Sequence, residues 1–329
     1  MAEVKKPNFS YSRLEQYVNC PFAYKLKYED KKFIEGDTII TLIGSLTHKI
    51  CEEISLSLME GKSPNYDELI DKYYNYNIPK RNPYDTEGGI FGLNILRARF
   101  PEEYYKPSEK TGLNYFNKAK SFIDNIRRQE EFMLAHPELE LWDVEHPFAF
   151  QYAGNSMKGF IDRVLKYKKE NRFVIHDIKT KDRLFPKTEA TTPLQMVCYG
   201  LSMQSEIGQD VNVEECYWDL VFIQEMQRAG TKGFMNRGIK KLDKIFAGIS
   251  AKEFAPKPSP LCYWCPFSNT NPNVTEEGRN LCPYYSKWTP ENPNFNKMFE
   301  WAGMDMVEEH TMLLKATENA HKKYGGFVL

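Results

Sequence analysis

A short strand-like stretch of the chain combines apolar residues with two charges of opposite sign. In VIHDIKTKD, residues 174–182, one residue separates Asp177 from Lys179. Side chains alternate between the two faces of a β-strand, so these two charges share one face. One interpretation is an edge strand whose Asp177 and Lys179 are solvated or pair with neighbours. The other is a site in which the carboxylate and the ammonium group take part in chemistry.

A second aspartate lies at a spacing that favours the chemical interpretation. Asp162 stands in GFIDRVLKY, and only the short turn KKENR separates this segment from the following strand. The pattern predicts an antiparallel hairpin, in which a symmetric turn pairs Val164 with Ile175 and Asp162 with Asp177. A shift of one residue would instead place the two aspartates on opposite faces.

Two carboxylates opposed in this way would repel each other on an otherwise apolar face. Directly opposed residues of an antiparallel pair have Cβ atoms about 4.5–5.5 Å apart. Burying two like charges at that distance costs free energy, and a bound divalent cation removes the conflict. Phosphodiester hydrolysis uses such an ion, because Mg²⁺ or Mn²⁺ on two carboxylates can activate water and neutralise phosphate charge. A neighbouring lysine would add a point charge suited to phosphate.

The element that could complete this site is a helix predicted for residues 41–60. Its apolar stripe recurs every four residues and consists of Leu42, Leu46, Ile50, Ile54 and Leu58. His48 lies opposite that stripe, on a row with the small residues Gly44, Cys51 and Ser55. Small side chains let the helix approach another element closely, with the imidazole projecting from it. A lone histidine is usually a surface or core residue, but here His48 is a candidate third metal ligand.

Three of the seven cysteines cluster late in the chain. Cys262 and Cys265 form a C-x-x-C, whose geometry lets two thiolates bind one metal centre, and Cys282 follows after sixteen intervening residues. In an intracellular chain such cysteines favour thiols or metal ligands over disulfides. Three ligands leave a site incomplete, so a fourth must come from elsewhere. The scattered cysteines are interpreted as core residues: Cys51, Cys198 and Cys216.

The composition limits the classes of protein that the chain can represent. Its 329 residues carry a formal net charge of −1, with 41% apolar and 27% charged residues, as is typical of folded domains. No apolar run approaches the roughly 18–20 residues of a membrane span, and the start lacks the apolar core of a signal peptide. We therefore expect a cytoplasmic protein. The glycine motifs of phosphate loops and dinucleotide sites are absent, so nucleotide-driven motors and dinucleotide enzymes lack support.

The elements that would position these residues change in type along the chain. Helices are expected near residues 9–30, with a cap at Ser10 or Ser12 and a break at Cys20–Pro21. Residues 61–140 also look mostly helical, with an interruption at RNPYDTEGG. From about residue 144, the β-rich segments FAFQYA, MKGFIDRVLKYK and RFVIHDIKT alternate with polar turns.

A second helical region follows the predicted sheet. It begins at Thr192, and Gln195 and Tyr199 form an i,i+4 pair on it. The segment CYWDLVFIQEM predicts one further strand, and the Pro-rich AKEFAPKPSP connects to the cysteine cluster. The tail from about Asn294 to Tyr324 is expected to be helical.

In combination, these motifs resemble the PD-(D/E)XK nuclease superfamily. The similarity is to its RecB-like exonuclease branch with an iron–sulfur cluster, which includes the AddB nuclease domain and the CRISPR-adaptation exonucleases. The matching segments, in family order, are SYSRLEQYVNCPFAYKLKY, GSLTHKICEEI, GFIDRV, VIHDIKT, LQMVCYG and CYWCPF. Each is short, but together they span about residues 10–283. The resemblance implies an α/β, RecB-like restriction-endonuclease-type fold: a central mixed β-sheet flanked by helices, with the N- and C-terminal regions tied by a metal cluster.

The resemblance also implies roles for individual residues around a catalytic Mg²⁺ or Mn²⁺. His48, Asp162 and Asp177 would hold the metal, helped by the backbone carbonyl of Ile178. Lys179 would orient the attacking water and stabilise the developing negative charge.

The remaining implied residues are a supporting pair and a cysteine centre. Gln195 and Tyr199 would support the site or contact the DNA strand. A [4Fe–4S] cluster would be held by Cys20, Cys262, Cys265 and Cys282. The last two of these cysteines lie farther apart here than is usual in the family, and the segment between them is expected to be a surface loop. Four thiolates also suit Zn²⁺, which remains the alternative.

We therefore expect one nuclease domain over residues 1–329. Its parts would be a mainly helical region (10–140), a catalytic sheet and helix (144–225), a cysteine region (255–290) and a helical tail (291–329). The expected activity is metal-dependent exonucleolytic hydrolysis of single-stranded or end-resected DNA in recombination, repair or replication. Candidate partners are DNA and a helicase, single-strand-binding or recombination protein, with no membrane. The rival hypotheses are a non-catalytic DNA-binding or assembly module that retains the fold, and an RNA-processing nuclease with a zinc-stabilised cysteine site.

Overall fold

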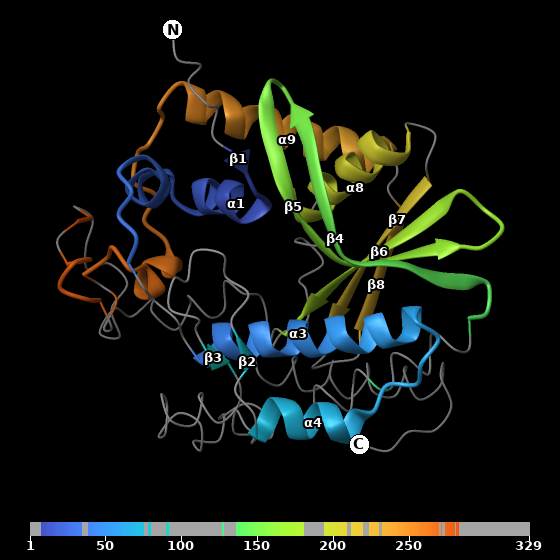
Figure 1. Cartoon of the computed structure of the whole chain (residues 1–329). Coiled ribbons are helices and arrows are strands. Elements are labelled where there is room, and N and C mark those ends of the chain that lie inside the picture. Colours follow the sequence, from blue (N-terminus) through green and yellow to red (C-terminus); the bar gives the residue numbers. More distant parts are fainter. Residues whose placement is uncertain are drawn as a thin grey trace, which may run out of the picture.

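The fold was determined from a computed structural model of the chain (Figure 1). The residues that it describes are 8–34, 39–75, 78–79, 90–91, 127, 136–180, 194–208, 212–219, 224–229, 232–269, 271, 274–279 and 281–282. The interruption predicted at residues 81–89 and the predicted helical tail lie outside these ranges, as does most of the region from 92 to 135.

A mixed six-stranded sheet forms the centre of the molecule (Figure 1). Its strands are β1 (Asn8–Phe9), β4 (Leu139–Tyr152), β5 (Asn155–Tyr167), β6 (Arg172–Lys179), β7 (Asn212–Asp219) and β8 (Gln224–Ala229). The order is β1-β5-β6-β7-β8, with β4 also paired to β5. The β1–β5 and β6–β7 pairs are parallel and the others antiparallel. The predicted central mixed sheet is therefore confirmed. A separate short ladder joins β2 (Ile78–Pro79) to β3 (Ile90–Phe91).

The predicted β5–β6 hairpin forms in the predicted register. Val164 pairs with Ile175, as a symmetric turn requires. The ladder ends at the next pair, Arg163 with His176, so Asp162 and Asp177 lie one step beyond the paired residues. The ladder between the two strands ends at this point, and the carboxylates of Asp162 and Asp177 contact different groups.

Side chains do not alternate strictly between the two faces of β5 around Asp162. Phe160 and Val164 should share a face, yet Phe160 is 59% exposed whereas Val164 is fully buried. Val164 and Ile161 instead contribute to the same core cluster. The β4–β5 ribbon thus turns over between residues 161 and 164, and Asp162 lies within that turn-over. The long ribbon twists visibly across the sheet in Figure 1.

One side of the sheet is covered by helices that enclose the main core. These are α1 (Tyr11–Asn19), α8 (Leu194–Ile207) and α9 (Lys232–Ser250), which contact one another (Figure 1). The N-cap of α1 is Ser10, whose hydroxyl accepts a hydrogen bond from the Arg13 N–H at 3.2 Å. Of the two predicted caps, Ser10 and Ser12, the first is therefore confirmed. The predicted break follows at Cys20, after which α2 (Pro21–Tyr24) continues as a π-helical turn, Lys25–Glu29.

The other side of the sheet carries α3 (Ile39–Met59), with α4 (Tyr66–Asn75) beyond it (Figure 1). The predicted apolar stripe of α3 is buried at Leu46, Ile50 and Ile54. The opposite row also approaches the sheet. A Cβ built on Gly44 would lie 3.4 Å from the Thr180 hydroxyl, just past the end of β6. The small residue predicted to permit close approach therefore lies at a close contact.

Two elements of the second half differ from their predictions. The segment CYWDLVFIQEM was predicted as one strand, but it spans the end of β7 and the start of β8, which pair antiparallel. Helix α9 was not predicted, although its positions Phe234, Leu242 and Phe246 are buried. The helix predicted after the sheet is present as α8, and its predicted start at Thr192 lies outside the described residues.

Within the described residues, no helix has both the length and the apolar character required to span a bilayer.

Candidate active site

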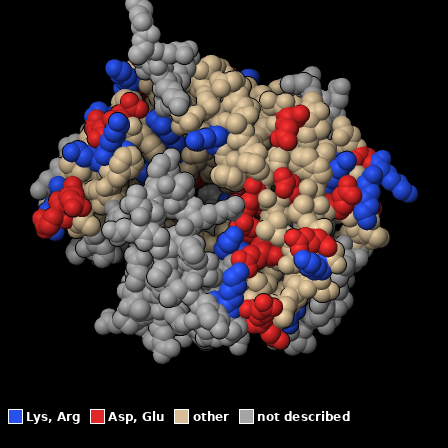
Figure 2. Space-filling model, viewed as in Figure 1, with Lys and Arg blue, Asp and Glu red and all other residues tan. Residues whose placement is uncertain are grey.

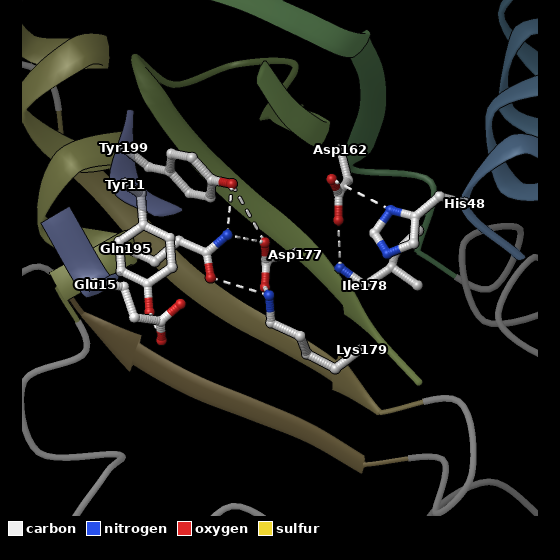
Figure 3. A network of polar contacts seen from close by, with 9 residues as sticks. All are labelled: Tyr11, Glu15, His48, Asp162, Asp177, Ile178, Lys179, Gln195 and Tyr199. Atoms are coloured by element: carbon white, nitrogen blue, oxygen red, sulfur yellow. Dashed lines mark hydrogen bonds and ion pairs between the residues drawn. The ribbon is translucent and has the colours of Figure 1, made fainter. Parts of the chain in front are cut away.

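The predicted site residues come from four elements and converge in one polar region (Figure 3). Helix α3 carries His48, β5 carries Asp162, β6 carries Asp177 and Lys179, and α8 carries Gln195 and Tyr199. In Figure 3 they form two neighbouring networks, one around Asp177 and one around Asp162.

Asp177 lies at the centre of the first network and is 1% exposed. Its Oδ1 accepts from the Gln195 amide at 2.8 Å and from the Tyr199 hydroxyl at 3.3 Å. Its Oδ2 forms an ion pair with Lys179 Nζ at 2.5 Å. Lys179 also donates to Gln195 Oε1 at 2.9 Å, so the amide bridges the aspartate and the lysine. The predicted i,i+4 pair on α8 is thus in direct contact with the predicted D-x-K residues.

Asp162 lies at the centre of the second network. Its Oδ2 accepts from the backbone N–H of Ile178 at 2.6 Å, and its Oδ1 lies 3.5 Å from His48 Nδ1. Ile178 was predicted to offer its carbonyl to a metal, and here its N–H is the group that contacts Asp162. This hydrogen bond brings the backbone of β6 next to Asp162 and orients the Asp162 carboxylate.

A further carboxylate, which the sequence did not single out, joins this second network. One ligand atom each from His48, Glu145 and Asp162 lies within 4.8 Å of the others, a group suited to holding a metal ion. In the part of the chain that the structure describes, no other group of three or more His, Cys, Asp or Glu residues meets that spacing. Glu145 is a single acid in a β-rich segment, so sequence spacing carried no signal for it.

The electrostatics of the site reflect this concentration of carboxylates. Burial acts to lower the pKa of His48, but the charges of Asp162 and Asp177 outweigh it and raise the pKa to about 9. Burial likewise opposes the charge of Lys179, yet Asp177 raises the pKa of this lysine above its ordinary value. Burial acts to raise the pKa of Asp162, whereas His48 and the Ile178 N–H hold it below its ordinary value. A site that draws positive charge to His48 also favours a bound cation.

Helix α1 supplies two more polar groups at the edge of the site (Figure 3). The Tyr11 hydroxyl donates to Glu15 Oε1 at 2.6 Å. Burial raises the pKa of Tyr11, and Glu15 and Asp177 raise it further. Both residues lie in the matched segment SYSRLEQ, where their i,i+4 spacing was the available signal.

On the molecular surface, acidic side chains gather in and below a hollow near the centre of the face in Figure 2. Comparison with Figure 1 places this area between α1 and α3, beside β5. The chain as a whole is nearly neutral, with a net charge of −1. The acidic side chains of this area are therefore balanced by basic residues elsewhere in the chain.

The four predicted cysteine ligands come from the two ends of the described chain. Cys20, Cys265 and Cys282 pack around a small core formed by Ala23, Leu26 and Phe267. Burial raises the pKa of Cys265 to about 12, and Cys262, Cys20 and Cys282 each contribute in the same direction. The predicted joining of N- and C-terminal regions is therefore present as packing. Among the described residues, these sulfurs are not a compact group like His48, Glu145 and Asp162.

The segment between Cys265 and Cys282 was expected to be a surface loop, and it folds back tightly. A Cβ on Gly278 would lie 2.0 Å from the Pro266 carbonyl oxygen, so only glycine allows this approach. Cys282 then donates its backbone N–H to the Phe267 carbonyl at 3.1 Å. The fold-back returns Cys282 to the neighbourhood of Cys265.

Comparisons with known proteins identify the family of the chain. A curated relative from Clostridium novyi (strain NT), one of the subunits of an ATP-dependent helicase/deoxyribonuclease, is 26% identical over 205 residues, which is 59% of this chain. The match spans only 17% of that relative's length. A solved structure of a candidate exonuclease from Eubacterium rectale is 14% identical, with a TM-score of 0.43, over 78% of this chain and 86% of that one. The model of one family matches residues 8–270, which include both polar networks. The chain therefore belongs to the PD-(D/E)XK nuclease superfamily.

Proposed function

We propose that this protein is a divalent-metal-dependent DNA exonuclease that hydrolyses phosphodiester bonds in single-stranded or end-resected DNA. The observation that carries the proposal is the bridge from Lys179 through Gln195 to Asp177, next to the His48–Asp162 contact. A half-buried lysine held beside a buried carboxylate is costly unless the site serves chemistry on a charged substrate. The deoxyribonuclease name of the curated relative supports DNA as the substrate.

The donor set fits Mg²⁺ or Mn²⁺. His48, Asp162 and Asp177 would hold the ion, with the Ile178 carbonyl as a further candidate ligand. Carboxylate oxygens suit both metals, and neutral imidazole suits Mn²⁺ and is tolerated by Mg²⁺. When bound, such an ion supplies an activated water and neutralises charge on the phosphate oxygens.

The protein's own contribution is to hold one cation at a defined point. Asp177 and Gln195 bind Lys179 Nζ from two sides, at 2.5 and 2.9 Å. Because its pKa is raised, Lys179 remains protonated at neutral pH and can orient water or bind a phosphate oxygen. Tyr199 accepts from the Gln195 amide at 2.8 Å and so fixes the rotamer of the bridge. Gln195 and Tyr199 act on the reaction by positioning Asp177 and Lys179.

The cysteine region is proposed to hold a [4Fe–4S] cluster on Cys20, Cys262, Cys265 and Cys282, with Zn²⁺ as the alternative. Two backbone donors support sulfur ligands here. The Lys257 N–H lies 3.5 Å from Cys20 Sγ, and the Ser259 N–H lies 3.4 Å from Cys262 Sγ. Such donors stabilise thiolate charge and tune metal–sulfur centres.

The cofactor test is the iron and sulfide content of protein purified without oxygen. We expect a brown protein whose iron is lost in Cys265→Ser and retained in Cys51→Ser, since Cys51 is buried in α3. A colourless wild type that contains zinc would rule out the iron–sulfur proposal.

The activity test is digestion of end-labelled DNA with Mg²⁺ or Mn²⁺, beside an RNA of the same sequence. We expect DNA to be shortened from an end, and Asp177→Ala to abolish this while circular dichroism stays unchanged. Asp67→Ala, in the first turn of α4 and exposed, is the matched control. A wild type that never cuts DNA would support the non-catalytic module, and one that cuts only RNA would support the RNA-processing alternative.

The name of the curated relative also supports a protein partner for this chain, whatever its activity on DNA. That relative is a helicase/deoxyribonuclease subunit, and the matched region is a small part of it. A helicase, a single-strand-binding protein or a recombination protein could therefore deliver DNA ends to this site.

A further inference from the structure

The backbone of β4 departs from strand geometry at one acidic residue. Glu145 has φ of +48°, in the left-handed region that glycine adopts easily and other residues adopt at a cost. Three other non-glycine residues of the described chain share this sign of φ: Lys31, Ala153 and Lys252. Those three follow a helix or lie in the β4–β5 turn, whereas Glu145 lies between paired strand residues.

The register of the ribbon places this residue opposite a proposed metal ligand. Val144 pairs with Arg163 and His146 pairs with Ile161, so Glu145 lies across from Asp162. One of its carboxylate oxygens comes within 4.8 Å of the ligand atoms of His48 and Asp162. The ribbon turns over next to this pair, where Glu145 has its left-handed backbone and the register also shifts between Leu141 and Asp143.

The backbone on both sides of Glu145 is anchored. On one side, the Val144 N–H donates to Asp143 Oδ1 at 2.8 Å. On the other, the His146 ring lies between Asp143 Oδ2 at 2.7 Å and Glu206 Oε2 of α8 at 2.9 Å. His146 is 5% exposed, whereas the side chains of Asp143 and Glu206 are 38% and 44% exposed, so two partly exposed carboxylates hold a buried ring. The residues on both sides of Glu145 are therefore held by hydrogen bonds.

We propose that Glu145 is a further ligand of the catalytic cation, alongside His48 and Asp162. The inference rests on the proposed metal dependence and deepens it. Two carboxylates and an imidazole that converge within 4.8 Å are stabilised together by a divalent cation. The left-handed backbone aims the Glu145 carboxylate at Asp162, and the hydrogen bonds on both sides of Glu145 hold that backbone. The left-handed backbone of Glu145 costs free energy, and a role as a metal ligand would explain why the fold retains it.

The experiment measures Mn²⁺ binding to the protein without DNA, by the loss of the free Mn²⁺ signal in electron paramagnetic resonance. Glu145→Gln keeps the side-chain shape and removes the charge, and we expect it to weaken binding roughly ten-fold or more. Glu145→Gly removes the ligand and relieves the backbone, so the metal-free protein should melt no lower than wild type. Ala153→Gly, at φ of +47° in the turn of the same ribbon, is the matched control. It should not weaken Mn²⁺ binding.

Separate results would overturn the inference and the proposed function. If Glu145→Gln binds Mn²⁺ as tightly as wild type, Glu145 is not a ligand, even where DNA cleavage has been demonstrated. A wild type that binds no Mn²⁺ also overturns it. If wild type binds Mn²⁺ through Glu145 but never cuts DNA, the ligand assignment stands and the nuclease proposal fails.

Discussion

The two halves of the polar site are built in different ways, although they lie on adjoining strands (Figure 3). The lysine half consists of Asp177, Lys179, Gln195 and Tyr199. Both oxygens of Asp177 have partners there, at 2.8 Å and 2.5 Å for the shortest contacts. The imidazole half consists of His48, Glu145 and Asp162. There the His48 ring approaches Asp162 only to 3.5 Å, and one ligand atom of each of the three residues lies within 4.8 Å of the others.

This difference separates two tasks that the chemistry requires. A network of short hydrogen bonds holds a charge in place and resists rearrangement. A set of acidic and imidazole donors that converge at longer distances is suited to receive a cation. We therefore infer that Lys179 and Gln195 of the lysine half govern the rate of cleavage. Metal affinity would depend on the imidazole half together with Asp177, its proposed co-ligand.

The largest effect that would test this division is removal of the lysine charge. Lys179→Met should lower the single-turnover rate of DNA cleavage at saturating Mn²⁺ by roughly 100-fold or more, since a positioned charge is lost from the reacting centre. Mn²⁺ affinity should not fall. Lys169→Met, in the exposed β5–β6 turn, is the matched control for a lost lysine. A Lys179→Met enzyme that cleaves DNA at nearly the wild-type rate would contradict the assignment of the cleavage rate to the lysine charge.

One variant in each half should have a smaller effect, on metal affinity in one case and on the cleavage rate in the other. His48→Gln should weaken Mn²⁺ binding roughly ten-fold while most of the rate returns at saturating metal. Gln195→Leu removes the bridge between Lys179 and Asp177, so it should lower the rate roughly ten-fold and leave Mn²⁺ affinity nearly unchanged. Calorimetry and single-turnover cleavage measure the two quantities. Equal effects of both variants on both quantities would show that the halves act as one unit.

The smallest predicted effect is a pH dependence of stability in the metal-free protein. The pKa of His48 is about 9 in the folded chain, against an ordinary value of 6.5. Protonated His48 therefore stabilises the fold fully below about pH 6.5, and this contribution is lost as pH rises toward about 9. Urea unfolding in EDTA should show wild type more stable than His48→Gln at about pH 6, with the gap closing by about pH 9.5. A gap that widens with pH would contradict the ion pair with Asp162.

The hairpin was predictable because its signal is local. The turn between β5 and β6 is short, so chain geometry leaves few registers, and Val164 pairs with Ile175 as expected. The roles of His48 and Gln195 depended on the family resemblance, since a lone histidine or amide carries little information. Their proximity to Asp162 and Asp177 is a property of the packed helices α3 and α8.

Glu145 illustrates what could not be predicted. Its neighbours in sequence form a regular β-rich pattern. Its left-handed backbone stands next to His146, which contacts Asp143 and Glu206 of α8. Helix α9 is a different case, because its buried positions at Leu242, Ile245 and Phe246 were visible as an amphipathic pattern.

By itself, the sequence determined the chemical inventory and the strands that carry it: Asp162, Asp177 and Lys179 on one hairpin. Periodicity and short turns act over a few residues, so they are legible in the chain. Only the tertiary structure decided which partners each charge receives. The β4–β5 ribbon turns over at Asp162, so the two aspartates have different partners. Asp177 accepts a hydrogen bond from the Gln195 amide of α8, and Asp162 contacts the His48 imidazole of α3. Hydrogen bonds and ion pairs between distant segments form only after packing brings those segments together, and no local pattern specifies them in advance.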